Sequence, residues 1–322
     1  MVNPFASTVT PKRRRLAVDA LSVDHELTVL ETTARDHATT LAAEASAAGA
    51  EVVVVLGGDG TLNEAVNGLT GTETALAALP GGSTNVFART IGIPNDAAKA
   101  TAQLTSLLAT RCIRRMPLGV VNGRRFLFHV GLGFDAAVVE QVERRAALKR
   151  KVGQAAFVYA TFATLARHFD RRRAYFTMQF GEGQFGEGQF GEGQVGEGQV
   201  DACESVDGSY AVVMNSNPYT YLGRIPLDLT SDAVEGRGLV AVTVSSLGLP
   251  TVLGLLTSAV GSGKRLRSMA NVDHRADLLS FTVQGKGPFP YQVDGDYLGG
   301  VETLAISYER DAVAIVAPPP RG

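Results

Sequence analysis

The feature that most constrains the fold is an apolar run that ends in a glycine turn and continues as a helix. Residues 52–56 are all valine or leucine, and Gly57-Gly58-Asp59-Gly60-Thr61 follows directly. A short apolar run without alternation predicts a parallel strand, here residues 51–56, covered on both faces. From Thr61 onward, apolar residues recur at the spacing of one helix face, at Leu62, Ala65, Val66 and Leu69.

A second strand–loop–helix unit follows the first. Residues 74–80 are an apolar strand, residues 81–85 are a polar glycine loop, and Asn95 is placed to cap a further helix that runs to about Ala109. A helix ending at Gly49 precedes both units. Strands that alternate with helices predict a doubly wound α/β sheet that binds ligands at the carboxyl ends of its strands.

The pattern changes after Arg111, where two extended runs flank Asn122-Gly123, a strong signal for a hairpin. Further strands are predicted near 174–180, 209–215, 239–245, 278–284, 303–308 and 312–316, with helices over 136–168 and 249–267. The chain is therefore divided into an α/β domain at 1–110 and a β-rich, sandwich-like domain at 111–310. Residues 311–322 are a strand and tail that could return to the first domain.

One segment belongs to neither pattern. Residues 180–199 contain the unit Phe-Gly-Glu-Gly-Gln, repeated four times with one variation. Its period is too short for a solenoid, and glycine resists ordering. The segment is predicted to be a flexible insertion at a hairpin tip, without chemistry of its own.

Composition excludes several classes of protein. A net charge of −2 and a pI of about 6.2 argue against nucleic-acid binding. The two cysteines, Cys112 and Cys203, are too few for a disulfide framework and favour a reducing compartment. No apolar run approaches the roughly 20 residues of a membrane span, and no signal peptide is recognisable. We expect a cytoplasmic protein with at most peripheral membrane contact.

The two glycine loops predict a phosphate site. Glycines let backbone N–H groups approach an anion, and the helix start that follows favours negative charge. The second loop, Gly81-Gly82-Ser83-Thr84-Asn85, adds hydroxyls and an amide at a second strand end. One glycine loop alone is as often structural, but two at adjacent strand ends predict a wide polyphosphate cradle. Neither loop is a P-loop or a GxGxxG motif.

Three carboxylates are candidates for chemistry. Asp59 lies inside the cradle, where Mg²⁺ would reconcile it with phosphate, and the alternative is a helix cap at Thr61. Asp294 and Asp296 flank Gly295 far downstream. Two carboxylates near a phosphate donor suit a general base and an electrostatic partner, although Asp-Gly is also a common turn.

These motifs resemble the diacylglycerol kinase catalytic family of bacterial lipid kinases, which is related to sphingosine kinases and more distantly to NAD kinases. The matching stretches are GGDGTLNEAVNGL, PGGSTNVFARTIGIP, VGLGFDA, NSNPYTYLG and the late DGD, in the family's order across nearly the whole chain. The resemblance implies an α/β nucleotide domain, a β-rich domain and an active site in the cleft between them.

The resemblance also implies residue roles. ATP would be the phosphate donor, with Mg²⁺. Asp296 would be the general base, where the family more often has glutamate, and Asp294 would orient or assist. The nucleotide contacts that the resemblance implies are Asn3, Pro4, Thr33, Gly58, Asp59, Gly60, Thr61, Leu62, Asn63, Glu64 and Ser83. The pattern of the two glycine loops adds Gly57, Gly81, Gly82, Thr84 and Asn85.

Two departures from the family pattern concern the sheet edge and a metal. The family has a strand before its Asn-Pro turn, whereas here Met1 almost reaches the turn. Either the start is mis-assigned or the sheet lacks this strand, which would expose a hydrogen-bonding edge. Members also often carry a metal site before a late strand. Its nearest match here is Asp232, Glu235 and Arg237, with glutamate in place of aspartate.

A basic cluster lies in residues 144–153 and includes Arg144, Arg145, Lys149, Arg150 and Lys151. It is either a solvated helix face or a surface attracted to anionic lipid, at roughly 1 kcal/mol per basic residue. The second interpretation would place the protein at the inner face of the membrane. A homodimeric state is left open.

The function implied is ATP-dependent phosphorylation of diacylglycerol to phosphatidic acid. Three alternatives stay open at this point: a kinase of a sphingoid base or another long-chain alcohol, a soluble kinase of the NAD type, and a nucleotide-binding sensor without catalysis.

Overall fold

The computed structural model describes residues 1–134, 136–137, 139–140, 174–181, 204–246, 251 and 266–320. Several predictions concern residues outside these ranges: the basic cluster, Cys203, the repeat beyond Gly181, and most of the helices expected over 136–168 and 249–267. None of the described helices combines the length and the apolar character needed to span a membrane.

The described helices are α1 (Pro11–Leu21), α2 (His37–Ala47), α3 (Asp59–Leu69), α4 (Val86–Thr90) and α5 (Ala97–Ala109), with a short 3₁₀ helix at Leu266–Ser268. The described strands are β1 (Val52–Gly57), β2 (Ala75–Pro80), β3 (Ile113–Val121), β4 (Arg124–Phe126), β5 (His129–Gly133), β6 (Phe176–Phe180), β7 (Glu204–Gly208), β8 (Tyr210–Met214), β9 (Thr220–Leu222), β10 (Ile225–Leu227), β11 (Leu239–Val244), β12 (Val272–Leu278), β13 (Ser280–Val293) and β14 (Asp296–Val316).

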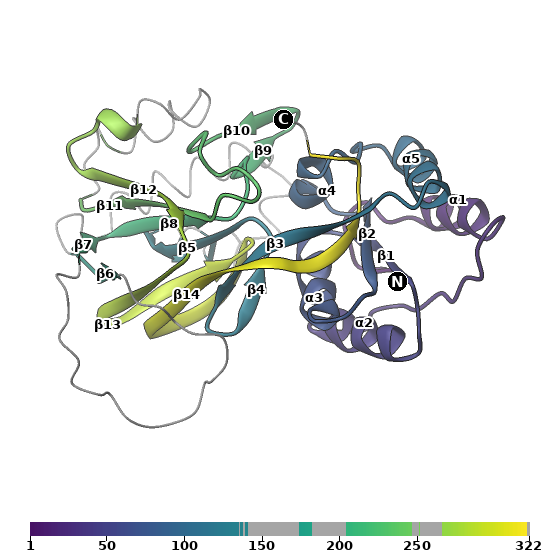
Figure 1. The fold of residues 1–322 in the computed structure, drawn as a ribbon, viewed down its shortest axis with the longest axis horizontal. Helices are drawn as coiled ribbons and strands as arrows, with labels where there is room; N and C mark the ends of the chain where they lie inside the picture. The colour runs from purple at the N-terminus through teal and green to yellow at the C-terminus, as the bar shows by residue number, and fades with distance from the viewer. Residues whose placement is uncertain are drawn as a thin grey trace.

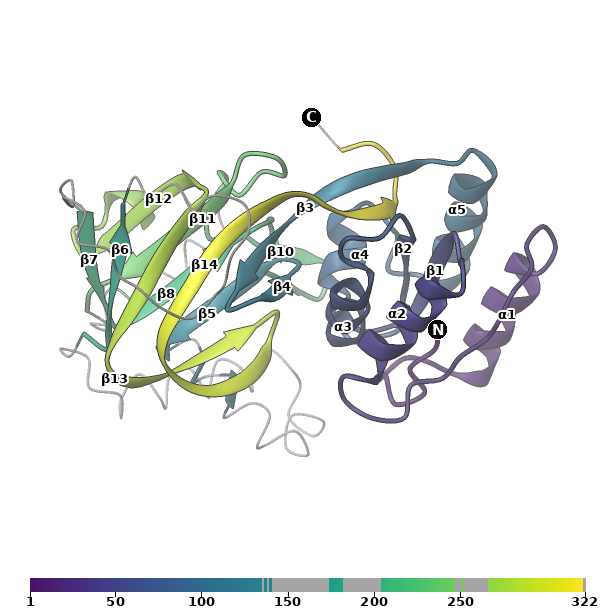
Figure 2. The same cartoon turned by 60° about the horizontal axis from the view of Figure 1, so that its bottom comes forward.

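The α/β part is layered. Strands β1 and β2 are parallel and in register, with Val54 opposite Ala77. Helices α2 and α3 pack together on one side of them and α1 and α5 on the other, as Figure 2 shows. The predicted order, a doubly wound α/β part followed by a β-rich part, is confirmed (Figure 1).

The apolar face of α3 explains how the first glycine turn is anchored. Leu62, Ala65, Val66 and Leu69 are all at most 1% exposed, as the helical spacing predicts. The helix begins at Asp59, with Gly58 as its N-cap, two residues before the predicted start. Burial of this face fixes the helix N-terminus at the carboxyl end of β1.

Strand β14 connects the two parts. It pairs with β13 and β3 in the β-rich part, and its far end pairs in parallel with β2, where Ile315 lies opposite Leu76. The two strands predicted at 303–308 and 312–316 are therefore one strand, interrupted by a register shift between Glu309 and Val313. One sheet thus runs through both parts (Figure 1).

The β-rich part has apolar clusters on both faces of its strands, one around Phe176 and Phe289 and another around Phe134 and Val242. The predicted Asn122-Gly123 hairpin joins β3 to β4, and both turn residues have positive φ, 46° and 81°. Strands β7 and β12 were not predicted, because their half-exposed sequences ESVDG and VDHRADL lack a continuous apolar face.

The cap of α5 is Asp96 and not Asn95. The Asp96 side chain accepts a hydrogen bond from the Lys99 N–H (2.9 Å). Asn95 instead accepts one from the side chain of Asn85 (2.7 Å), and this contact ties the end of the α4 segment to the second glycine loop.

The edge beside β1 is covered at its carboxyl end. Val2 forms parallel bridges to both Leu56 and Glu31, and the Asn3 N–H donates to the Leu56 carbonyl (3.0 Å). The edge expected to be bare is therefore occupied where the glycine loop begins. This pairing sets the Asn3-Pro4 turn beside the first glycine loop.

Candidate active site

A cavity of about 540 Å³ opens where β1 and β2 end. Its walls come from the N-terminal turn, both glycine loops and the first residue of β14. The lining residues are Asn3, Phe5, Ala6, Ser7, Thr32, Ala34, Arg35, Gly58, Asp59, Gly60, Thr61, Glu64, Gly82, Ser83, Thr84 and Asp296. The structure thus brings the two predicted loops and the predicted base to one site.

The two glycine loops touch each other through their backbones. The Gly81 N–H donates to the Gly57 carbonyl (2.8 Å). A Cβ added at Gly81 would lie 2.9 Å from the Gly57 backbone, and one at Gly82 would lie 2.8 Å from the Gly58 Cα. Only glycine fits at these positions, so the loops form one continuous surface.

Asp59 fastens the loops together. Its carboxylate accepts hydrogen bonds from the N–H groups of Val86 (3.0 Å) and Phe87 (2.9 Å), the first residues of α4. Burial raises the pKa of Asp59, and these two hydrogen bonds and Arg89 oppose that rise. The prediction set phosphate chemistry against a cap at Thr61, but the carboxylate caps a different helix. It also lines the cavity, so it retains lone pairs toward that side.

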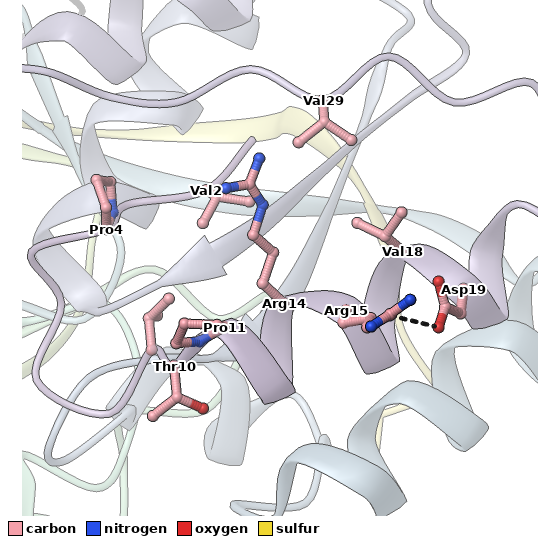
Figure 3. A pocket seen from close by; sticks show the side chains of 10 residues that line it. Val2, Pro4, Thr10, Pro11, Arg14, Arg15, Val18, Asp19 and Val29 are labelled. Carbon is pink, nitrogen blue, oxygen red and sulfur yellow. Dashed lines mark ion pairs between the residues drawn. The ribbon is translucent and has the colours of Figure 1, made fainter.

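The Asn3-Pro4 turn is fixed to the first loop. The Asn3 side-chain amide donates to the Thr61 hydroxyl (2.8 Å), and its carbonyl accepts from the Phe5 N–H (2.9 Å). Pro4 does not line the 540 Å³ cavity. It lies on a neighbouring one of about 450 Å³ between the N-terminal residues and α1, with Arg14 and Val18 (Figure 3).

Several residues predicted as nucleotide contacts lie behind the cavity wall. Leu62 belongs to the core, and Asn63 is 1% exposed. Asn85 accepts a hydrogen bond from the Gly82 N–H (2.7 Å) and so shapes the loop from behind. Thr33 bonds to His37, and its neighbour Thr32 lines the cavity instead. The predicted contacts Gly57 and Gly81 do not line the cavity either.

Asp296 faces the first glycine loop. A Cβ built on Gly60 would lie 3.3 Å from an Asp296 carboxylate oxygen, and that oxygen lies 3.6 Å from the Arg35 guanidinium. Burial raises the pKa of Asp296; Arg35 and Arg124 oppose the rise, and Asp36 adds to it. The carboxylate is therefore next to the loop that would hold phosphate, and two cations favour its ionised form.

Asp294 does not lie on the cavity, so its predicted catalytic role needs correction. Its carboxylate accepts four hydrogen bonds, from the Asn63 amide and from the N–H groups of Leu127, Phe128 and His129, over 2.7–3.1 Å. Burial raises its pKa to about 6 against the pull of these donors. Asp294 binds α3 to the start of β5.

The metal site expected at Asp232, Glu235 and Arg237 does not form. Asp232 lies 3.4 Å from His274, Glu235 pairs with Arg114, and Arg237 pairs with Asp277. Each of the three side chains thus lies against a different partner. Within the described ranges, no group of three or more His, Cys, Asp or Glu side chains is arranged to hold a metal ion.

Arg35, Phe5 and Thr32 line this cavity but were not predicted from the sequence, and the same is true of the smaller residues Ala6, Ser7 and Ala34. Arg35 and Thr32 lie beside Thr33, which the family resemblance did single out. Phe5 follows the Asn3-Pro4 turn directly. In each case the signal was proximity to a motif, and the missing information was which neighbouring side chain faces inward.

Comparison with known proteins gives matches to diacylglycerol kinases and lipid kinases. Residues 1–121 match the model described as the diacylglycerol kinase catalytic domain. A diacylglycerol kinase from Bacillus subtilis is 35% identical over 136 residues, 41% of this chain and 43% of that protein. A Pseudomonas aeruginosa protein named "Probable lipid kinase YegS-like" is 38% identical over 135 residues, 41% of this chain and 42% of that protein. The matches span about two fifths of each relative's length.

The fold extends the similarity beyond the matched segment. The crystal structure of a diacylglycerol kinase from Bacillus anthracis str. Sterne superposes with a TM-score of 0.66 at 19% identity, covering 99% of this chain and 95% of the other. At this identity the match shows the fold. The resemblance to the diacylglycerol kinase family is confirmed, and it is carried in sequence by residues 1–121.

Proposed function

We propose that this protein is an ATP-dependent lipid kinase that phosphorylates the primary hydroxyl of diacylglycerol and forms phosphatidic acid. One observation carries the proposal: the Asp296 carboxylate shares a cavity with two glycine loops that lie at adjacent strand ends. The family match over residues 1–121 supports a kinase, and the relatives' names support a lipid acceptor.

The donor side of the reaction is assigned to the glycine loops. Gly58, Gly60, Gly82, Ser83 and Thr84 all line the cavity. Backbone N–H groups at a helix N-terminus bind phosphate, and here α3 starts at Asp59. These groups would hold the polyphosphate so that the bond between the β- and γ-phosphates breaks in line with the incoming hydroxyl.

Asp296 is assigned as the general base. It would accept the proton of the acceptor hydroxyl while the oxygen bonds to the γ-phosphorus, and ADP carries away the bridging oxygen. Arg35 and Arg124 favour its ionised form. Asp294 supports this role only indirectly, by holding the turn from which Asp296 extends.

The cavity has the donor set that Mg²⁺ prefers. Asp59 and Asp296 both line the cavity, and magnesium takes one or two carboxylates together with phosphate oxygens. We propose that Asp59 would hold it there, together with oxygens of the bound phosphates. The ion would supply neutralisation of the phosphate charge, which the acidic cavity otherwise opposes.

The test is a radiolabelled-ATP assay with diacylglycerol, a sphingoid base and NAD as separate acceptors, and with Asp296→Asn as the control. We expect label in phosphatidic acid and its loss in the variant. Label in the sphingoid base or in NAD would instead select the long-chain-alcohol or NAD-type alternative. ATP binding by calorimetry without turnover on any acceptor would identify a nucleotide sensor.

We further propose that the protein works at the inner face of the membrane, held peripherally by Arg144, Arg145, Lys149, Arg150 and Lys151. The support is the cluster of basic residues in the sequence, together with the need of a lipid kinase to reach its substrate. Sedimentation with anionic vesicles should weaken on charge reversal at Arg144, Arg145 and Lys149. Unchanged sedimentation would refute this role.

A further inference from the structure

Phe5 is the most exposed large hydrophobic side chain in the described part of the chain. It is 79% exposed, and it lines the 540 Å³ cavity beside the glycine loops. Because about four fifths of Phe5 is exposed, its aromatic ring gains little stabilisation from burial within this protein. The ring is therefore available to a ligand.

The backbone beneath Phe5 is held on three sides. The Phe5 N–H donates to the Asn3 side chain (2.9 Å), and the Ala6 N–H donates to the Asn3 carbonyl (3.2 Å). Two residues later, the Thr8 N–H donates to the Gly81 carbonyl (2.9 Å). The turn that carries Phe5 is thus fixed to both glycine loops, and this sets the backbone of Phe5 relative to the phosphate site.

We infer that Phe5 is the surface on which the base of the donor nucleotide stacks, an inference that rests on the proposed kinase function. Aromatic side chains stack on nucleobases through flat π faces that every base possesses. The neighbouring wall residues Ala6, Ser7, Thr32 and Ala34 are small and leave room for a flat ring.

Stacking also has a consequence for specificity. Because it does not read hydrogen-bonding edges, it binds adenine and guanine nucleotides alike. Insertion of Phe5 into a membrane is the competing role. It is disfavoured because the wall around Phe5 is polar or small, whereas insertion requires a wider apolar face.

The sequence contains no tryptophan, which makes a direct test available. Phe5→Trp creates a single-tryptophan protein whose fluorescence reports on this position. We expect ATP and GTP to quench it, and inorganic tripolyphosphate to bind without quenching. Val23→Trp is the matched control, since Val23 is 76% exposed and does not line the cavity. Its fluorescence should not respond to any of the three ligands.

Affinity measurements give the second arm. Phe5→Ala should weaken ATP binding by about 5- to 150-fold, the range that ~1–3 kcal/mol per stacked base represents. Tripolyphosphate binding should be unchanged. Phe5→Leu, which keeps the apolar character but not the flat face, should lose ATP affinity like Phe5→Ala.

Three results would overturn the inference. Equal weakening of ATP and tripolyphosphate in Phe5→Ala would show that the side chain only supports the turn. A fluorescence change of Phe5→Trp with anionic vesicles but not with ATP would assign it to the membrane. Failure of the wild-type protein to bind either ATP or tripolyphosphate would overturn the proposed function itself. This result is distinguishable from the first two, because it appears in the wild type and not only in the Phe5 variants.

Discussion

Asp294 and Asp296 are two residues apart and have opposite surroundings, so the same substitution should do different things to them. In Asp294, one carboxylate oxygen accepts from Asn63 (2.8 Å) and Leu127 (2.7 Å), and the other accepts from Phe128 (2.9 Å) and His129 (3.1 Å). Asp294→Asn replaces one oxygen with an NH₂ group. Whichever way the amide turns, its NH₂ faces two N–H donors and cannot accept from them.

The size of the effect follows from those contacts. Each hydrogen bond to a charged group is worth about 1.5–3 kcal/mol, so two lost bonds cost roughly 3–6 kcal/mol. Removing a buried charge returns part of this, because the desolvation penalty disappears. We expect a net loss of about 2–5 kcal/mol in the free energy of unfolding. At roughly 2 °C per kcal/mol in a large chain, the melting temperature should fall by about 4–10 °C.

Asp296→Asn is the matched control. Its carboxylate makes one long ion pair, 3.6 Å to the half-exposed Arg35, and such pairs contribute about 0–1 kcal/mol. The melting temperature should therefore stay within about 2 °C of wild type, while single-turnover phosphoryl transfer at saturating ATP is lost. Thermal unfolding by circular dichroism and quenched-flow transfer measure both quantities. If Asp294→Asn melts like wild type but transfers no phosphate, the two roles have been assigned the wrong way round.

Four further predictions follow from the site. Because burial raises the pKa of Asp294 from 3.8 to about 6, the folded state binds a proton more tightly than the unfolded state does. This proton adds up to about 3 kcal/mol to the free energy of unfolding below pH 4, and the gain is lost as pH rises through 6. Urea titrations across pH 4–7 should therefore show a steeper loss of stability with pH for wild type than for Asp294→Asn. Asp59→Asn should cut turnover by ~10²-fold and also lower the melting temperature, since its carboxylate accepts two N–H groups of α4; a melt unchanged from wild type would contradict the capping role. Arg35→Ala should move the acidic limb of the pH–rate profile to higher pH, because Arg35 lowers the pKa of Asp296. Arg35→Lys should return the limb most of the way to its wild-type position. An unmoved limb in Arg35→Ala would show that Arg35 does not influence the ionisation of the base. Excising residues 185–199 should leave melting and turnover nearly unchanged, at about 0.6 kcal/mol per doubling of loop length, and a loss of activity would show that the repeat binds something.

Local patterns predicted the elements that local physics decides. The valine run of β1, the spacing of Leu62 and Val66 on α3, and the Asn122-Gly123 turn each depend on neighbours within a few residues. The two glycine loops were paired correctly for the same reason, since parallel strands place their carboxyl ends at one edge.

Long-range contacts could not be predicted in this way. In Asp-Gly-Asp the two carboxylates look equivalent, and alternation along a strand would place both on one face. Asp294 has a φ of 49° and Gly295 one of 88°, so the chain turns between them. The donors that then select Asp294 lie about 165 residues earlier, at 127–129. Asp59 likewise contacts α4 only because β2 pairs with β1 and so places α4 beside the first glycine loop.

The continuity of β14 constrains where the chain can gain or lose residues. Its first residue is Asp296 on the cavity, and near its last Ile315 pairs with β2 in the α/β core (Figure 2). Deleting one residue between them would move Asp296 by about 3.3 Å along the strand and turn it to the opposite face. A displacement of ~1 Å can already cost ~10²-fold in rate. The length of this strand is therefore as restricted as the identity of the base.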